Sequence, residues 1–138
     1  MSPLGGGSVS TLCPKAVVQA AAALGVDTDS LLRAAGIDAS LLRTPGERIP
    51  LASYLELYRM AVERSGDPDL GLYVGHIIYF SGLNFHLYMT TICRTLKEYF
   101  NVIPSTLRLR GDTGRVLINP EGDYIRLEWH PLDERTAT

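Results

Sequence analysis

The sequence predicts an α+β domain, in which an N-terminal helical block is followed by a small antiparallel β-meander. Apolar residues recur at three- and four-residue steps over residues 51–62, which is typical of an amphipathic helix. After residue 105 apolar and charged residues alternate instead, which is typical of half-buried strands. The chain has 138 residues, of which 46% are hydrophobic, so it can form one domain with a core of its own.

Charge and composition narrow the function. The formal net charge is −2, so this chain lacks the basic surface that strong binding to nucleic acid requires. It has no apolar run long enough to span a bilayer and no cationic segment followed by an apolar one at its start, so we expect a cytoplasmic protein. Cys13 and Cys93 are far apart and outside any metal-binding spacing. Reduced thiols fit that compartment, with one disulfide as the alternative.

The first third of the chain predicts short helices after a leader. Residues 1–12 are rich in Gly and Ser and lack periodicity, so we assign them to a flexible leader and residues 13–138 to the domain. Three helices are then expected. The first covers residues 14–24, is opened by Pro14 and is closed by Gly25. The second is capped by Asp27 or Thr28 and has Leu31, Leu32 and Ala35 pointing inward, and the third is a single turn from Asp38 to Arg43.

The first two of these helices have the alanine, glycine and apolar spacing of a DNA-binding helix-turn-helix. The second helix, however, would present Asp27 and Asp29 to the phosphates, with only Arg33 following them. We therefore expect a packed helical pair that does not bind DNA.

The segment 49–75 predicts a long helix and a short one. Pro50 suits the first helical position, and Gly66 ends the long helix. Its predicted buried stripe is Leu51, Tyr54, Leu55, Tyr58 and Val62, and its predicted outer face is Ser53, Glu56, Arg59 and Glu63. Asp67 then caps a short helix that we expect to stop at Gly75.

Residues 76–104 predict an extended piece and two more helices. H-I-I-Y-F at 76–80 is apolar and β-branched, and is expected as a strand or an extended connection. A helix from about Asn84 to Cys93 follows. Thr95 and Glu98 form a capping box that starts another helix, and Pro104 is expected to stop it.

Three alternating segments are expected to form the meander: T-L-R-L-R, R-V-L-I-N and Y-I-R-L-E-W-H. The side chains expected to point to the core are Leu107, Leu109, Ile125, Leu127 and Trp129. Those expected on the other face are Arg108, Arg110, Tyr124, Arg126, Glu128 and His130.

Two motifs carry a resemblance to a known family. R-I-P-L-x-x-Y begins at Arg48, and G-D-P-x-L-G-L-x-x-G begins at Gly66; a Gly-containing break, a T-L-x-E helix start and paired strands follow. In this order they resemble the effector-binding domain, of the arabinose-binding type, of AraC-type bacterial transcription regulators, from about Val17 to the end. The resemblance implies a homodimeric sensor that binds a small molecule and controls DNA binding by a C-terminal helix-turn-helix domain.

Members of that family continue beyond such a meander into further elements, a linker and the DNA-binding domain. The sequence ends soon after the last strand, so we expect a fragment or a truncated regulator. A meander that stops there leaves a strand edge unpaired, which favours self-association.

The break between the helical blocks offers the mixture of aromatic and polar groups that a small-molecule pocket needs. The candidate effector-binding residues are His76, Tyr79, Phe80, Asn84, His86 and Tyr88. The alternative is that these aromatics are ordinary core residues. Arg108, Arg110 and Arg126 on the meander could bind an anionic effector, or could form a solvated face with Glu128 as partner.

Catalytic and metal chemistry are not predicted. The chain has no phosphate-binding loop, nucleophile elbow or H-E-x-x-H motif. The pairs Asp27/Asp29 and Asp67/Asp69 stand at helix starts, where Asp is expected as a cap. We therefore expect no cofactor, no metal and no membrane partner. A stand-alone protein-interaction or dimerisation module without a ligand is the alternative function, and a small enzyme is the least supported.

Overall fold

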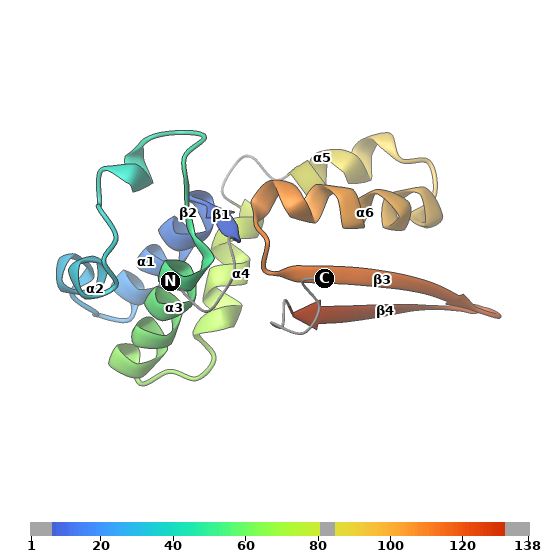
Figure 1. Cartoon of the computed structure of the whole chain (residues 1–138). Helices are drawn as coiled ribbons and strands as arrows, with labels where there is room; N and C mark the ends of the chain where they lie inside the picture. Colours follow the sequence, from blue (N-terminus) through green and yellow to red (C-terminus); the bar gives the residue numbers. More distant parts are fainter. Residues whose placement is uncertain (1–6, 81–84, 132–138) are drawn as a thin grey trace.

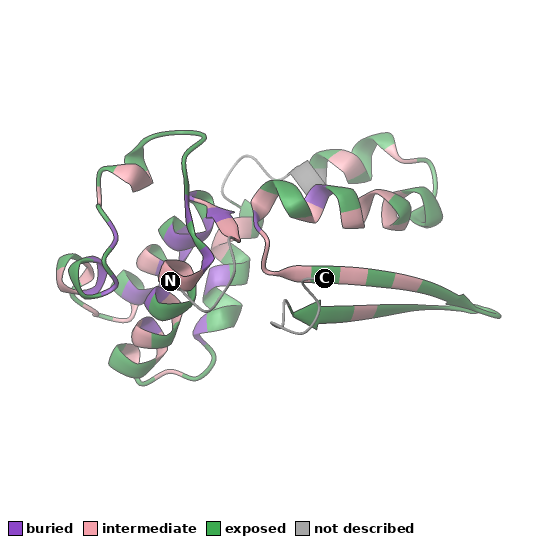
Figure 2. Ribbon diagram, in the orientation of Figure 1, coloured by how far each residue is buried: buried purple, intermediate pink, exposed green. Residues whose placement is uncertain are grey.

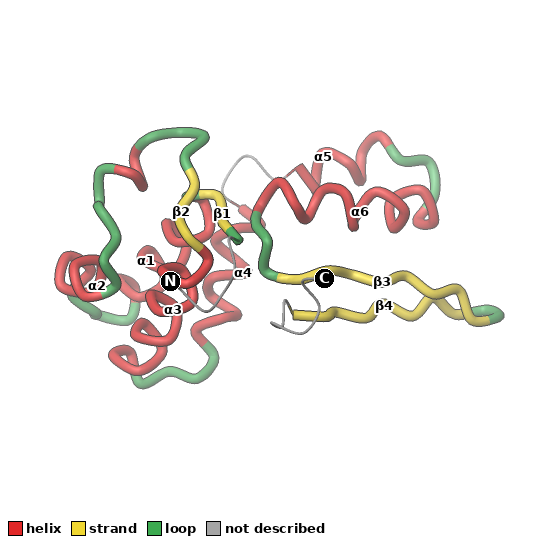
Figure 3. Tube along the Cα trace, viewed as in Figure 1, coloured by secondary structure: helices red, strands yellow, loops and turns green. Residues whose placement is uncertain are grey.

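The computed structural model describes residues 7–80 and 85–131 (Figures 1 and 3). Its helices are α1 (Leu12–Ala23), α2 (Thr28–Ala34), the 3₁₀ turn η1 (Leu41–Arg43), α3 (Leu51–Ser65), α4 (Leu70–Phe80), α5 (Phe85–Ile92) and α6 (Leu96–Arg110). Its strands are β1 (Ser8–Ser10), β2 (Arg48–Pro50), β3 (Gly114–Glu121) and β4 (Tyr124–Pro131). The predicted α+β class, with helices first and an antiparallel unit last, is confirmed.

Residues 7–80 form the N-terminal block, in which α1 packs against α3 and α4 (Figure 1). All hydrophobic residues that are buried in the described chain belong to this block, from Val9 to Val74, and they form one cluster. Leu31, Leu57 and Leu70 are the largest of its fully buried side chains. Figure 2 shows the buried positions gathered around these helices. Residues 85–131 form the C-terminal unit, which extends away from the block.

Two helix caps in the block are those that the sequence predicts, whereas α1 begins at Leu12 and not at the predicted Pro14. Asp27 accepts hydrogen bonds from the N–H groups of Asp29 and Ser30 at the start of α2. Gly66 ends α3 with a φ of 66°.

The predicted buried stripe of α3 is confirmed except at one position, because Leu51 is buried and Tyr54, Tyr58 and Val62 pack against the core. Leu57 is fully buried, whereas Leu55 is 44% exposed. The side of α3 that packs into the block thus includes Leu57 in place of Leu55.

Helix α4 continues through Gly75, so the predicted stop at this glycine and the predicted strand at 76–80 are wrong. A glycine inside a helix costs only about 1 kcal/mol relative to alanine. Burial of Val74 and packing of Ile77 and Ile78 against the core offset that cost.

Helix α6 likewise continues past Pro104 to Arg110, so the first predicted strand of the meander is wrong. Leu107 lies four residues after Ile103, and therefore extends the helical stripe as well as it fits an alternating strand. Leu109 is off that stripe and is 63% exposed. The start of α6 is as predicted, because the Thr95 hydroxyl accepts the N–H of Glu98 at 3.1 Å.

The second half of the expected leader is part of the fold. Strand β1 pairs antiparallel with β2, with Val9 opposite Ile49, and Val9 is fully buried. The predicted end of the leader at residue 12 is therefore too late. A single apolar residue between two serines is enough for a short strand when a second strand can pair with it.

A cluster of polar contacts, here called the Arg48 clasp, joins the N-terminal block to the C-terminal unit. The Arg48 guanidinium donates to the Ser8 hydroxyl (2.7 Å), to the Ser8 carbonyl (2.9 Å) and to the Leu109 carbonyl at the end of α6 (3.3 Å). The Asp112 carboxylate accepts the Ser8 N–H at 2.9 Å and lies 3.7 Å from Arg48. Beside the clasp, Gly111 lies directly against Val9.

Strands β3 and β4 form a hairpin that runs alongside α6 (Figure 1). Glu121 is opposite Tyr124, so Gly122 and Asp123 form the turn. Gly122 has a φ of 59° and Asp123 does not have a positive φ, which is the pattern of a type II′ turn. The hairpin is thinly covered: Ile125, Leu127 and Trp129 are 41%, 49% and 50% exposed. Among the described helices, the structure contains none with the length and apolar character needed to cross a membrane.

Candidate functional site

Three of the predicted effector-binding residues lie together on the last two turns of α4. The ring centroids of His76 and Phe80 are 4.6 Å apart, and those of Tyr79 and Phe80 are 5.0 Å apart with the rings nearly perpendicular. Tyr79 is 49% exposed and Phe80 is 67% exposed. This α4 aromatic cluster (His76, Tyr79, Phe80) is therefore a surface feature and not part of the core.

The other predicted effector-binding residues are not brought into a common site by the described residues. Tyr88 is on α5 and is 62% exposed. Asn84 lies outside the described residues, and so does the side chain of His86. A pocket formed by all six residues stays a prediction.

The three candidate anion-binding arginines do not share a strand face, and a common anion contact stays a prediction. Arg108 and Arg110 lie in the last turn of α6, whereas Arg126 is on β4. Arg126 is paired with Glu121 at 2.7 Å and lies 3.7 Å from Glu128. The three arginines were expected on one strand face, but the helical conformation of 106–110 places two of them on α6.

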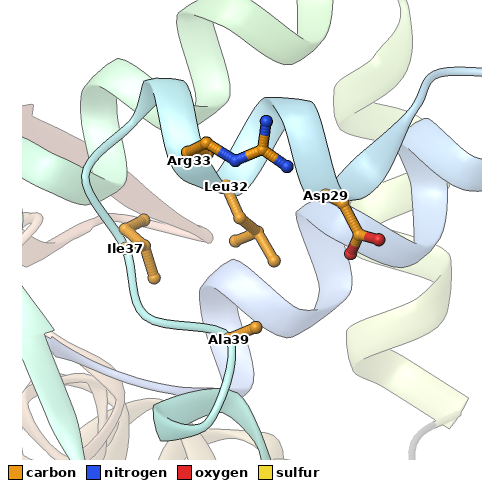
Figure 4. A pocket seen from close by; sticks show the side chains of 5 residues that line it. All are labelled: Asp29, Leu32, Arg33, Ile37 and Ala39. Carbon is orange, nitrogen blue, oxygen red and sulfur yellow. The ribbon is translucent and has the colours of Figure 1, made fainter.

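A hollow beside α2, here called the α2 cleft, is a candidate site that the sequence did not reveal (Figure 4). It has a volume of about 280 Å³ and is lined by Asp29, Leu32, Arg33, Ile37 and Ala39. Leu32 and Ile37 are 6% and 7% exposed and form its apolar floor. Asp29 and Arg33, one helical turn apart, place one negative and one positive side chain at its rim.

The chain reversal after α2 builds this cleft. Gly36 has a φ of 67°, which lets the chain turn back so that Ile37 lies beside Leu32. The loop is then held by Asp38, whose carboxylate accepts the N–H of Ser40 at 2.8 Å. This hydrogen bond lowers the pKa of Asp38, because it stabilises the charged carboxylate. The signals in the sequence were the glycine and the Asp38 cap, but they do not specify a hollow.

What the α2 cleft can bind follows from its lining. An apolar floor with a carboxylate and a guanidinium at the rim suits a small molecule that carries both charges or an anionic head on a short apolar body. A volume near 280 Å³ lies at the small end of ligand sites in general.

A second hollow, of about 220 Å³, lies where the chain turns from α5 into α6. Its lining residues are Thr90, Cys93, Arg94, Thr95, Leu96 and Tyr99. The capping box occupies this turn, since the Glu98 carboxylate accepts the N–H of Arg94 at 2.7 Å. Glu98 thereby places a negative charge where an anion would otherwise find the helix N-terminus, so the hollow is better explained as part of the cap. In the described ranges no three His, Cys, Asp or Glu side chains are grouped as metal ligands.

The comparisons with known proteins identify the family. A family model described as the arabinose-binding domain of the AraC transcription regulator, N-terminal, matches residues 25–138. This range includes the α2 cleft, the α4 aromatic cluster, Arg48 and the hairpin. No curated protein matches the chain. Because the family model covers most of the sequence, the chain belongs to the family of N-terminal arabinose-binding domains of AraC-type transcription regulators.

Proposed function

We propose that this chain is the ligand-sensing and self-association part of an AraC-type regulator in the bacterial cytoplasm. It binds a small-molecule effector, has no catalytic role, and modulates DNA binding by a C-terminal domain. The observation that carries this proposal is the family match over residues 25–138, because that family is one of ligand-binding regulatory domains. The family description names arabinose, but the effector of this chain follows from its own site.

An effector changes the output of a regulator only if it binds two conformations with different affinity. The α2 cleft and the α4 aromatic cluster are both in the N-terminal block, and the Arg48 clasp connects this block to α6 and the hairpin. An effector that shifts the helices of the block can therefore change the position of the C-terminal unit through the clasp.

The effector contacts that we favour are those of the α2 cleft. Its floor is apolar and its rim is charged, whereas the rings of the α4 aromatic cluster are exposed on a convex helix surface. Arg33 would bind a carboxylate or phosphate of the effector, and Asp29 a cationic or hydroxyl group.

A thermal-shift screen of the full chain tests this proposal. Amino acids, sugars, organic acids, fatty acids and nucleotides are the compound classes, and a ligand that binds the native state raises the melting temperature with its concentration. Arg33→Ala is expected to abolish the shift. Arg43→Ala, which removes the same charge from an exposed residue outside the cleft, is the matched control and is expected to preserve it.

Two other outcomes change the conclusion. Loss of the shift in Phe80→Ala but not in Arg33→Ala would move the effector site to the α4 aromatic cluster. No shift with any class, from a protein that unfolds cooperatively, would contradict ligand sensing and favour a stand-alone interaction module. The exposed apolar side chains of the C-terminal unit would then be its contact surface.

A further inference from the structure

The outer edge of β4 is open for backbone pairing. In the described chain, β3 is the element with which β4 makes extended contact. The turn at Gly122 and Asp123 makes Glu121 and Tyr124 a hydrogen-bonded pair, and such pairs alternate along an antiparallel ladder. Arg126, Glu128 and His130 therefore direct their backbone groups to β3. The N–H and C=O groups that point outward belong to Ile125, Leu127 and Trp129.

The outer edge of β3 differs from that of β4. By the same alternation Pro120 is one of its outward-facing residues, and proline has no N–H to donate. β3 is also the strand that lies against α6. On β4, by contrast, each outward-facing position before Pro131 has a donor and an acceptor. A new strand would therefore pair with β4 and not with β3.

The sequence of β4 is complementary to itself in antiparallel pairing. If Leu127 pairs with Leu127 of a second copy, Ile125 pairs with the second Trp129 on the apolar face. On the opposite face Arg126 then lies across from the second Glu128. This position is a non-hydrogen-bonded pair, in which side chains are closest. A shift of the register by two residues in either direction removes the Arg126–Glu128 pairs and places either Arg126 or Glu128 opposite its own copy.

We propose that two copies of this chain associate through their β4 strands, which pair antiparallel about a two-fold axis at Leu127 into a four-stranded sheet, β3–β4–β4–β3. The interface rests on the self-association in the proposed function and gives it a location. It covers Ile125, Leu127 and Trp129, which are about half exposed in the single chain, and it satisfies the free backbone groups of the β4 edge.

Charge exchange between the two strands tests this interface on the full chain under reducing conditions. Glu128→Arg leaves Arg126 facing a second arginine, and Arg126→Glu leaves Glu128 facing a second glutamate. Each variant alone is expected to weaken the dimer on the order of tenfold, because two pairs across the axis become repulsive. An equimolar mixture of the two variants restores both attractive pairs, so it is expected to form a heterodimer at concentrations where each variant alone is monomeric.

Sedimentation over a range of concentrations measures the association. Fluorescence gives a second readout, because Trp129 is the chain's single tryptophan and its emission should shift to the blue as the dimer covers it. Arg115→Glu is the matched control: it makes the same charge change on the same face of the hairpin, but on β3. It is expected to leave the dimer unchanged.

The outcomes separate the two levels of the proposal. A wild-type chain that stays monomeric at all concentrations overturns the interface and the proposed self-association together. A dimer that is insensitive to both charge changes, or a mixture that fails to associate when the single variants remain folded, overturns the β4 interface and leaves self-association standing. Ligand sensing is measured separately by the thermal shift.

Discussion

The N-terminal block and the C-terminal unit are built on different principles. Within the block, helices from distant parts of the chain cover a continuous apolar cluster that extends from Val9 to Val74. Within the described C-terminal unit the buried residues are Thr106 and Gly111. Several of its large apolar side chains, such as Leu96, Leu109 and Trp129, are at least half exposed. The N-terminal block therefore provides most of the buried apolar area that stabilises the fold, whereas the C-terminal unit exposes apolar side chains on the surface.

The difference has a thermodynamic consequence. A hairpin of two strands is marginally stable in water unless a further layer covers it. The C-terminal unit is thus expected to open locally at lower free energy than the block, as binding regions often do.

Leucine truncation should distinguish the two regions most clearly. Leu57→Ala removes a fully buried side chain from the block and is expected to cost about 2–5 kcal/mol. Leu127→Ala, the matched change at a residue 49% exposed, is expected to cost less than about 1 kcal/mol. Urea unfolding followed by far-ultraviolet circular dichroism measures both. Equal losses would show that the hairpin belongs to the same cooperative core.

Gly111→Ala should strain the contact between the two regions. A Cβ at this position would lie 2.6 Å from Val9 Cγ1 and 3.2 Å from Val9 Cα, and Val9 is fully buried. We expect a loss of about 1–3 kcal/mol from overpacking. In the double variant with Val9→Ala, part of this loss should be recovered, because the clashing methyl group is gone.

Gly75→Ala is the control for that prediction. It makes the same change inside α4, where a Cβ would meet nothing within 4 Å, so it should raise stability by up to about 1 kcal/mol. If Gly75→Ala and Gly111→Ala had the same effect, close packing at Val9 would not explain either.

Arg48→Ala should loosen the connection while leaving both regions folded. The clasp is partly solvated, with the Arg48 side chain 36% exposed, so we expect a loss of about 1 kcal/mol. Hydrogen exchange should accelerate at the N–H of Asp112, which donates to the Ser8 carbonyl. Arg48→Lys should not rescue it, because an ammonium group cannot reach three acceptors in the planar geometry of a guanidinium. Unchanged exchange at Asp112 would show that backbone pairing alone holds the junction.

Alkaline pH should lower the free energy of unfolding of the N-terminal block gradually, and by less than the substitutions above. Burial raises the pKa of the Cys13 thiol above its usual 9.0, against the opposing charges of Arg110 and Arg48. Burial, with smaller contributions from Cys13 and Tyr58, likewise raises the pKa of Tyr54 above its usual 10.0. Because both folded-state pKa values are raised, this stability is present below the usual values and is lost as pH rises above them.

The test compares urea unfolding at about pH 8 and at about pH 10.5. Tyr54→Phe should reduce the loss of stability between these two conditions, since phenylalanine has no proton to release. Tyr88→Phe, at a residue 62% exposed on α5, is the control and should leave the loss unchanged. A loss that is identical in all three proteins would assign the pH dependence to other groups.

Local signals in the sequence predicted much of the fold. The cap at Asp27, the capping box at Thr95 and the left-handed Gly66 are each determined within a few residues, and all three were predicted correctly. The predictions failed where the outcome depended on packing. Gly75 and Pro104 weaken a helix without forbidding it, and the helices continue because apolar residues beyond them find partners or extend a stripe.

The candidate site was harder to predict than the fold. The aromatic residues of α4 are visible in the sequence, but their exposure depends on which face of the helix meets α1. The α2 cleft depends on Ile37 returning beside Leu32 after Gly36, which is a relation between two segments and not a motif. Likewise, the three arginines could be placed on one face only by assigning 106–110 to a strand.

The Arg48 clasp also bears on the order in which the chain can fold during its synthesis. Strand β1 can pair with β2 as soon as Pro50 has left the ribosome. The bonds between Ser8 and Asp112, however, join residues 104 positions apart, so they form only after α6 has been made. Until then Val9 lacks its contact with Gly111, although β1 is already paired with β2 and packed against α1 and α3. Ser8 and Val9 thus reach their final environment only after the segment that follows α6 has been made.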